Sequence, residues 1–393
     1  MLLQIDEQPP KSFALFNLGF RPFFLFAAYS AVLLMLIWLL MYHQLISLNG
    51  YYGLIDWHSH EMLFGYASAV IAGFLLTAVR NWTNVDTITK IPLAVLAVVW
   101  LAARILPFTA LPGSLVAITN LLFFLLLTLA VAHPIIKVKQ KNNYIMILLL
   151  GCFLIADLLV QLQHLGLLPQ GVGYGNTLAL YSILFVIMVL SGRVMPFFTR
   201  VVVPGTEIIE RPRLEAVLQI LLVLLALAEL LSLNGYVIAA LAAGLAVAHS
   251  LRVIPWFSRP VLNIPILWVL FAGYVWIIIG FVLKILAGLD LVTDNLSIHA
   301  WTVGAIGIIT YGMMARVSLG HTGREMVAPR LAVIGFFILF LAAIVRVFLP
   351  LVSMSLYLRW IDISGFLWIA AFVLFAMAYT AILYRPRVDG RAG

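Results

Sequence analysis

The feature that most constrains the fold of this chain is a succession of long apolar stretches that carry almost no charge. Phe23–Tyr42 and Ile363–Leu383 are two such stretches without a charged side chain. A helix needs about 20 apolar residues to cross the hydrocarbon core of a bilayer. Repeating this count along the sequence predicts about twelve membrane-spanning helices. The predicted spans are 22–43, 59–79, 91–109, 113–133, 144–165, 175–195, 214–232, 236–255, 262–286, 298–316, 329–349 and 361–384.

The composition excludes a soluble globular protein. Hydrophobic residues make up 64% of the 393 residues, charged residues make up 10%, and the mean hydropathy is +1.13. The stretches between the predicted spans are too short and too apolar to fold as a separate soluble domain. We therefore predict an all-α membrane protein with one polytopic domain over residues 1–393.

The basic residues predict the orientation in the membrane. The formal net charge is +8, and the Lys and Arg side chains collect on alternate loops and after the last span. Basic loops face the cytoplasm, so both termini are expected there, in a bacterial inner membrane. Nucleic acid is not needed to explain this charge. The residues concerned are Lys137, Lys139, Lys141, Arg193, Arg200, Arg211, Arg213, Arg252, Arg259, Arg316, Arg324, Arg330, Arg385, Arg387 and Arg391.

A weak internal pattern recurs every four predicted spans. Spans 2, 6 and 10 each end in an arginine that a threonine follows: Arg80 and Thr83, Arg193 and Thr199, Arg316 and Thr322. The pattern favours three four-helix units around a pseudo-threefold axis. The alternative is that arginine simply marks the cytoplasmic ends of helices.

Histidines at the start of two spans are the leading candidates for a functional site. His58 and His60 open span 2, and His299 opens span 10 at the same bilayer depth. Neutral imidazole is the usual axial ligand of haem iron. Residues two apart on a regular helix point to nearly opposite sides, so only one of His58 and His60 can face His299. The other would bind a second metal or orient a ligand. The alternative reading is a set of polar rings at headgroup depth.

Further polar residues lie in the outer half of the predicted bundle. His164 could complete a second metal site, or it is a plain interfacial residue. Arg104 and Arg346 are candidate partners of haem propionates, because arginine binds carboxylates in a bidentate way. Glu61 and Asp157 are candidates for a proton path. Lys284 is a further ionisable residue at this depth. For Lys284 and Arg346 the alternative is that the long side chain extends along the helix to the membrane–water interface.

Other chemistries are excluded by what the sequence lacks. Cys152 is the single cysteine, so there is no CxxCH motif for covalent haem attachment and no thiolate metal cluster. We also find no phosphate-binding loop, no dinucleotide fingerprint and no Ser-His-Asp pattern.

Several stretches resemble the NnrS family of haem- and copper-containing membrane proteins, and together they spread over nearly the whole chain. The resemblance implies b-type haem, copper as a further metal, and a role in nitric oxide metabolism or nitrosative-stress defence. The stretches that carry it are Asn17–Phe24, Trp57–Gly65, Ala72–Val79, Asn81–Thr83, Gly192–Arg200, His299–Ala305 and Met313–Arg324.

The architecture is also similar, more loosely, to the catalytic subunit of haem–copper oxidases and nitric oxide reductases. There, helices 2 and 10 of twelve supply the axial ligands of a haem. This chain departs from that pattern because predicted spans 6 and 7 contain no histidine and span 10 contains one. The usual copper triad is therefore missing, and fold analogy alone does not transfer function.

Two functions from different classes are compatible with these features. The first is a haem protein that binds nitric oxide near the outer face and senses, scavenges or reduces it. Reduction would require a quinol or an external redox protein as electron donor, and it would make the protein an oxidoreductase. The second is a polytopic transporter of a metal or a small molecule. A polar path across the midplane would favour transport, and Asn120 is the clearest polar residue there.

Overall fold

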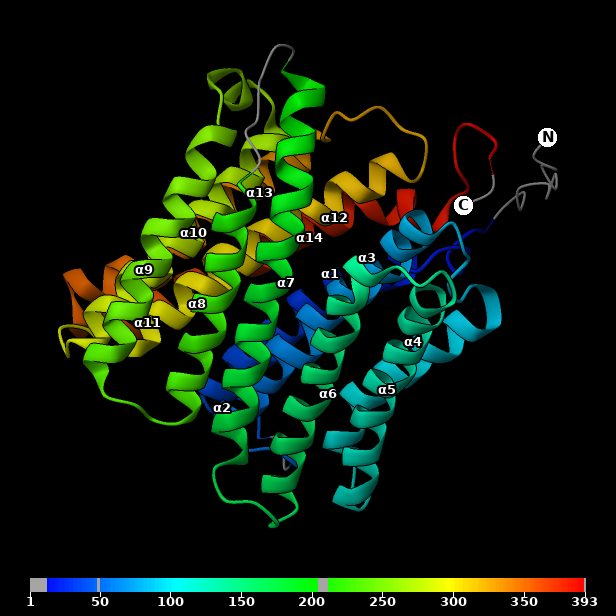
Figure 1. Ribbon diagram of the computed structural model, residues 1–393. Coiled ribbons are helices and arrows are strands. Elements are labelled where there is room, and N and C mark those ends of the chain that lie inside the picture. The colour runs from blue at the N-terminus through cyan, green and yellow to red at the C-terminus, as the bar shows by residue number, and fades with distance from the viewer. Residues whose placement is uncertain (1–12, 48–49, 204–210, 392–393) are drawn as a thin grey trace.

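The computed structural model describes residues 13–47, 50–203 and 211–391 and folds them into one helical bundle (Figure 1). No strand occurs within these ranges. The α-helices are α1 (Phe20–Tyr42), α2 (Leu54–His60), α3 (Ser68–Thr83), α4 (Lys90–Ile105), α5 (Gly113–Lys137), α6 (Tyr144–His164), α7 (Gly171–Val202), α8 (Pro212–Leu230), α9 (Gly235–Val253), α10 (Pro265–Gly288), α11 (Asp294–His299), α12 (Ile308–Gly320), α13 (Arg330–Val352) and α14 (Tyr357–Tyr384).

Short segments of other helix types join or interrupt these helices. Two are π-helical, η1 (Glu61–Ala67) and η6 (Ala300–Gly307), and they connect α2 to α3 and α11 to α12. The others are 3-10 turns: η2 (Leu106–Phe108), η3 (Lys141–Asn143), η4 (Ile254–Trp256), η5 (Arg259–Asn263) and η7 (Met354–Leu356).

The prediction of an all-α membrane protein with about twelve spans is confirmed. Among the described residues, 11 helices are long and apolar enough to cross a membrane. The long helix α8 is not among these candidate spans, and it carries the charged residues Arg213, Glu215 and Glu229. Most helix ends lie within a few residues of the prediction. The largest differences are at span 2, which begins at Leu54, and at α7, which extends to Val202.

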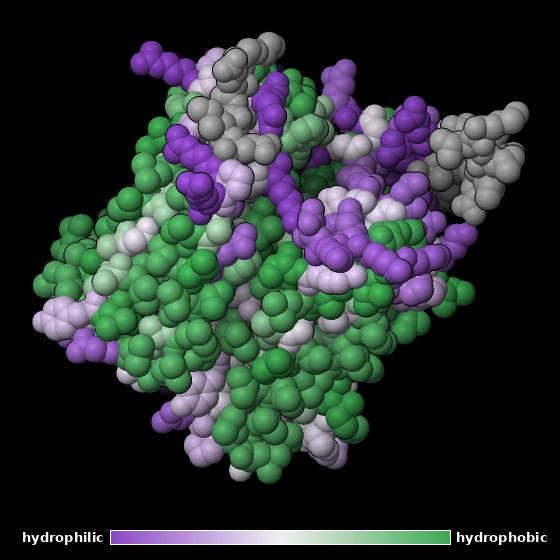
Figure 2. Space-filling view, in the orientation of Figure 1, coloured by the Kyte–Doolittle hydropathy of each residue, from purple (hydrophilic) through white to green (hydrophobic). Residues whose placement is uncertain are grey.

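The bundle has two chemically different ends. Many of the lysines and arginines lie in the loops α5–α6, α7–α8, α9–α10 and α12–α13 or in the helix ends next to them, and we call this the basic end. Figure 2 shows hydrophilic side chains gathered there, above a broad hydrophobic belt. The Ala14 N–H donates to the Tyr384 carbonyl at 2.8 Å, so the first and last described parts of the chain meet at this end. The opposite end, where α2 and α11 begin, we call the histidine end.

Three spans form the centre of the bundle. They are Leu54–Thr83, Gly171–Val202 and Asp294–Gly320, which are 78%, 72% and 78% buried, the highest values among the candidate spans. These are spans 2, 6 and 10 of the sequence pattern. Their convergence is what an arrangement of three four-helix units requires.

Both histidine-bearing spans contain a π-helical segment directly after the histidines. In η1 and η6 the backbone hydrogen bonds skip one residue more than in an α-helix, which widens the turn and changes the direction of the side chains that precede it. Such segments are frequent at functional sites. The third central helix, α7, has none over its described length.

Candidate functional site

A cavity of about 360 Å³ opens among the central helices near the histidine end. Its volume falls within the range of about 300–1,000 Å³ that ligand pockets occupy. His58 from α2 and His299 from α11 both line it, as the position of the two spans predicted. The remaining wall comes from α1, α7, α8, α10, α13 and α14, and it combines apolar and aromatic side chains with polar and charged ones.

The His58 ring is held by packing. It stacks on the Trp38 ring with 4.3 Å between ring centroids and an interplanar angle of 29°. Its nitrogens have no hydrogen-bond partner among the side chains and backbone that the structure describes. Met62 and Tyr66 share the cavity wall with His58, whereas Glu61 does not line it.

The His299 ring is oriented by its own helix. Its Nδ1–H donates to the Asn295 carbonyl at 2.8 Å. The lone pair of Nε2 therefore points away from the backbone, and it accepts a hydrogen bond from Arg346 Nη2 at 3.1 Å. A backbone carbonyl on one ring nitrogen is the usual device that fixes a histidine ligand for metal binding at the other.

Arg346 is buried at the cavity wall rather than extended to the interface. It is 8% exposed, and its Nη2 also lies 3.4 Å from the Tyr357 hydroxyl. Its Nη1 is buried and has no hydrogen-bond partner within the described structure. A guanidinium with an unused donor in a cavity wall is suited to a carboxylate or another anion.

An ion-pair cluster forms another part of the wall. Lys284 Nζ lies 2.8 Å and 2.9 Å from the two carboxylate oxygens of Asp294 and also pairs with Glu229. Lys284 is 4% exposed, so it does not extend to the interface either. Two carboxyl groups thus contact one ammonium group on this wall, which lies in the same cavity as the guanidinium of Arg346.

These residues fit a metal-bearing planar cofactor. Two imidazoles from separate helices face one cavity, and the unsatisfied Nη1 of Arg346 could bind a propionate there. One adjustment is required. A metal bound at His299 Nε2 would replace the hydrogen bond from Arg346, so the guanidinium would have to turn away from the imidazole.

His60 belongs to a separate, fully buried network. Its Nδ1 lies 3.0 Å from Glu61 Oε1 and its Nε2 lies 3.2 Å from Asp157 Oδ1. The Tyr52 hydroxyl and Gln161 Nε2 are also within hydrogen-bond distance of Nε2. Both carboxylates that the sequence offered for a proton path therefore contact one imidazole.

Arg104 closes this network on the other side. Its Nη1 lies 3.2 Å from Glu61 Oε2, and its Nη2 donates to Asn120 Oδ1. Arg104 does not line the cavity that holds His58 and His299. The structure thus places the two predicted propionate partners apart, and only Arg346 is at the cavity.

His164 lies at the histidine end, beside the His60 network. Its Nε2 is 3.6 Å from Asp56 Oδ2, and Tyr52 stands between the two histidine rings, with ring centroids 4.8 Å from His164 and 4.5 Å from His60. No group of three or more His, Cys, Asp or Glu side chains suited to a metal occurs in the described part of the chain. A second metal at His164 stays a prediction.

Some lining residues were not singled out in the sequence. Trp38 comes from α1 and Asp294 from α11, and Asn176 of α7 donates to Ser59 Oγ at 3.0 Å. Of these residues, only Asp294 could have been singled out from the sequence, because an acidic residue near the start of a membrane span rarely lacks a partner. The sequence alone does not distinguish Trp38 and Asn176 from other residues at helix interfaces.

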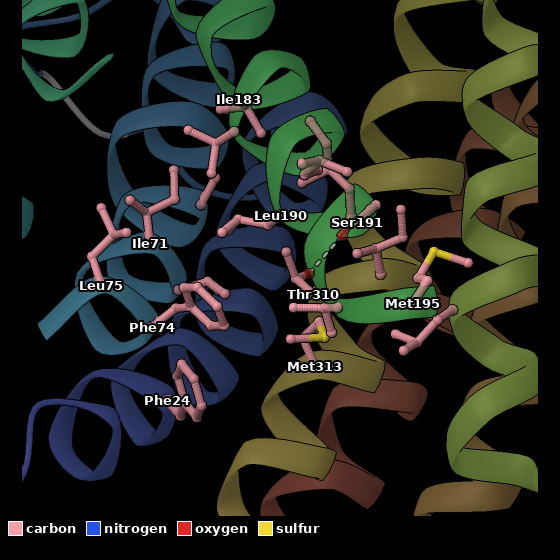
Figure 3. Close-up of a pocket in the computed structure, with 18 residues that line it drawn as sticks. Phe24, Ile71, Phe74, Leu75, Ile183, Leu190, Ser191, Met195, Thr310 and Met313 are labelled. Atoms are coloured by element: carbon pink, nitrogen blue, oxygen red, sulfur yellow. Dashed lines mark hydrogen bonds between the residues drawn. The ribbon is translucent and has the colours of Figure 1, made fainter. Parts of the chain in front are cut away.

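A second, apolar cavity of about 70 Å³ adjoins the first nearer the middle of the bundle (Figure 3). The two cavities share Ala67 and Ile306, which lie in η1 and η6. Phe74, Leu190 and Met313 are among the side chains that surround the second cavity in Figure 3. The polar Thr310 hydroxyl donates to the Ile306 carbonyl at 2.6 Å, so this cavity offers water few partners.

The fold and the site define a class: a multi-pass helical membrane protein whose central helices enclose a histidine-lined cavity. The comparison with protein families is more specific. The NnrS protein family matches residues 14–387, nearly the whole chain, and the chain belongs to that family. No individually curated protein matches the chain. Family membership is consistent with a role in nitric oxide metabolism.

Proposed function

We propose that this protein is an inner-membrane haem protein that binds nitric oxide, with its arginine-rich loops and both termini in the cytoplasm. The observation that carries the proposal is that His58 and His299, from two different helices, face one cavity. His58 and His299 would hold a b-type haem, and Arg346 would pair with a propionate. Reduced haem bound there would supply an electron for the reduction of nitric oxide, and it would supply a site for nitric oxide in exchange for one of the two imidazoles.

The chain's own residues would have distinct tasks around that group. Asn295 fixes the tautomer and the angle of His299, and Trp38 fixes the ring of His58. The apolar walls limit water. The adjoining apolar cavity could admit a small uncharged gas such as nitric oxide from the hydrophobic interior. Its lining offers few hydrogen bonds to water, so water would not compete strongly for the space.

Protons and electrons would be needed only if nitric oxide is reduced. Glu61 and Asp157 could pass protons through His60, since both carboxylates contact its ring. The electron donor would be a quinol or an external redox protein. Copper, which the family resemblance implies, would have His60 or His164 as candidate ligands.

An optical spectrum of the purified protein, oxidised and reduced, tests the proposal together with a pyridine haemochrome assay and metal analysis. A b-type spectrum that shifts with nitric oxide is expected. His58→Ala and His299→Ala should each remove or alter it, whereas His133→Ala, an exposed histidine on α5, should not. His60→Gln should keep the haem, because His60 faces the other network.

Two results would contradict the proposal. An unchanged spectrum in His299→Ala would remove the ligand assignment. A colourless protein that holds copper or zinc, after expression with ample haem supply, would favour the transporter instead.

A further inference from the structure

A cleft of about 840 Å³ lies at the basic end, between the ends of α7, α8 and α9. It lies at the opposite end of the bundle from the histidine-lined cavity and has no part in the proposed function. Four arginines line it: Arg193, Arg200, Arg211 and Arg252. Glu215 is the one carboxylate among the described lining residues.

Arg252 and Glu215 neutralise each other on one wall of the cleft. Arg252 Nε lies 2.7 Å from Glu215 Oε1, and its Nη2 contacts Oε2, so the pair is bidentate. Arg252 Nη1 also donates to the Tyr274 hydroxyl at 3.1 Å. The guanidinium lies close against α7 at Gly192, where an added Cβ would make Nη2 shift. Glu215 is therefore not free to neutralise another arginine.

None of the other three arginines pairs with a carboxylate within the described structure. Arg193 donates to Asn143 Oδ1 at 2.7 Å and to the Asn142 carbonyl at 3.0 Å, which holds its guanidinium in place. Arg211 donates to the Leu251 carbonyl at 3.3 Å. Arg200 is exposed and makes no hydrogen bond or ion pair there. Three positive charges thus share the cleft without a matching carboxylate among its described lining residues.

The geometry points to a binding site for a phosphate-ester anion in this cleft. Guanidinium groups bind phosphate oxygens in pairs and are weakly hydrated, so they suit this ligand better than lysine does. Basic clefts between helices at the cytoplasmic surface are typical sites for anionic lipid headgroups. The phosphate would come from an anionic phospholipid or from a soluble phosphate compound.

The surroundings of the cleft favour the phospholipid. Phe197, Val201 and Ile254 lie at the same helix ends and are 57%, 62% and 67% exposed. In a chain that spans a membrane, such side chains face acyl chains. A lipid could therefore place its phosphate among the arginines and its chains along this apolar surface.

Native mass spectrometry of the full-length protein in detergent would test the site. The probes are phosphatidylglycerol, phosphatidylcholine and inorganic phosphate. Wild type should retain phosphatidylglycerol over phosphatidylcholine, and retention should fall as salt rises. Arg200→Gln with Arg211→Gln should weaken it by roughly tenfold, because two charge-assisted hydrogen bonds are lost. Both residues are exposed, so the variant should fold.

The matched control is Arg259→Gln with Arg330→Gln, which removes the same charge from exposed positions at the same end but outside the cleft. Its lipid retention should equal that of wild type. Displacement of the lipid by millimolar phosphate would identify a soluble phosphate compound as the ligand, and no displacement would identify the lipid. Equal retention of the two lipids without phosphate binding, or equal losses in both double variants, would overturn the inference.

Discussion

Replacing Arg104 with methionine should destabilise the protein without removing the proposed cofactor. Arg104 and Glu61 are 7% and 1% exposed, and their charged atoms are 3.2 Å apart. At an effective dielectric constant of about 20, this attraction is about 5 kcal/mol. Removing one partner leaves a buried carboxylate with only His60 beside it, which typically costs about 3–5 kcal/mol.

The assay is reversible unfolding of the purified protein in mixed micelles, with the absorbance of bound cofactor recorded on the same samples. We expect Arg104→Met to lower the free energy of unfolding by about 3–5 kcal/mol. Adding Glu61→Gln should recover a large part of this loss, because the unpaired charge disappears. The control is Arg80→Met, which breaks an exposed pair with Asp86 and should cost less than about 1 kcal/mol.

Two results would refute this reasoning. A loss below about 1 kcal/mol, or losses that simply add in the double variant, would mean that the buried pair is not coupled. Loss of cofactor with unchanged protein stability would instead favour the propionate role that the sequence predicts for Arg104.

Three further variants test other parts of the structure. Gly280→Ala should cost about 1–3 kcal/mol in unfolding measurements, because its Cβ would overlap the Trp301 indole, whereas Gly173→Ala, with open space around it, should not destabilise. Burial and nearby arginines lower the pKa of His321 from 6.5 to about 4. Between these values the unfolded chain binds a proton that the folded protein does not, so the titration of His321 should lower stability by about 3 kcal/mol from pH 7 to pH 4. His321→Gln should flatten the dependence of stability on pH, and an unchanged slope would mean that His321 is not the group responsible. Ile306→Phe should narrow the junction of the two cavities and slow nitric oxide binding in stopped-flow mixing with an unaltered resting spectrum; an unchanged rate would exclude this route.

The positions of the helices could be predicted from the sequence because bilayer thickness fixes the length of each apolar run. The differences arise where helices extend beyond the apolar core. Span 2 begins at Leu54, five residues before the prediction, since Asp56, His58 and Ser59 are polar but helical. α7 extends beyond Arg200 because α-helical hydrogen bonds do not require an apolar sequence.

The site was predictable only in part. That His58 or His60 would lie near His299 followed from shared depth, but which one faces the cavity depends on the wide turns of η1. The partners of His60 also could not be predicted, because Asp157 comes from α6, far away in the sequence. Pairing between distant helices leaves no periodic signal.

The two π-helical segments have a consequence for how the histidines are aimed. Each residue of an α-helix turns the chain by about 100°. Deleting one residue from Glu61–Ala67 while its wide π-helical winding persists would rotate the turn that carries His58 and His60 relative to α3. The direction in which these rings point is thus set by the number of residues in the wide turns, rather than by the side-chain rotamers. A length change of one residue in either segment could reassign which imidazole faces the cavity while every side chain in it stays the same.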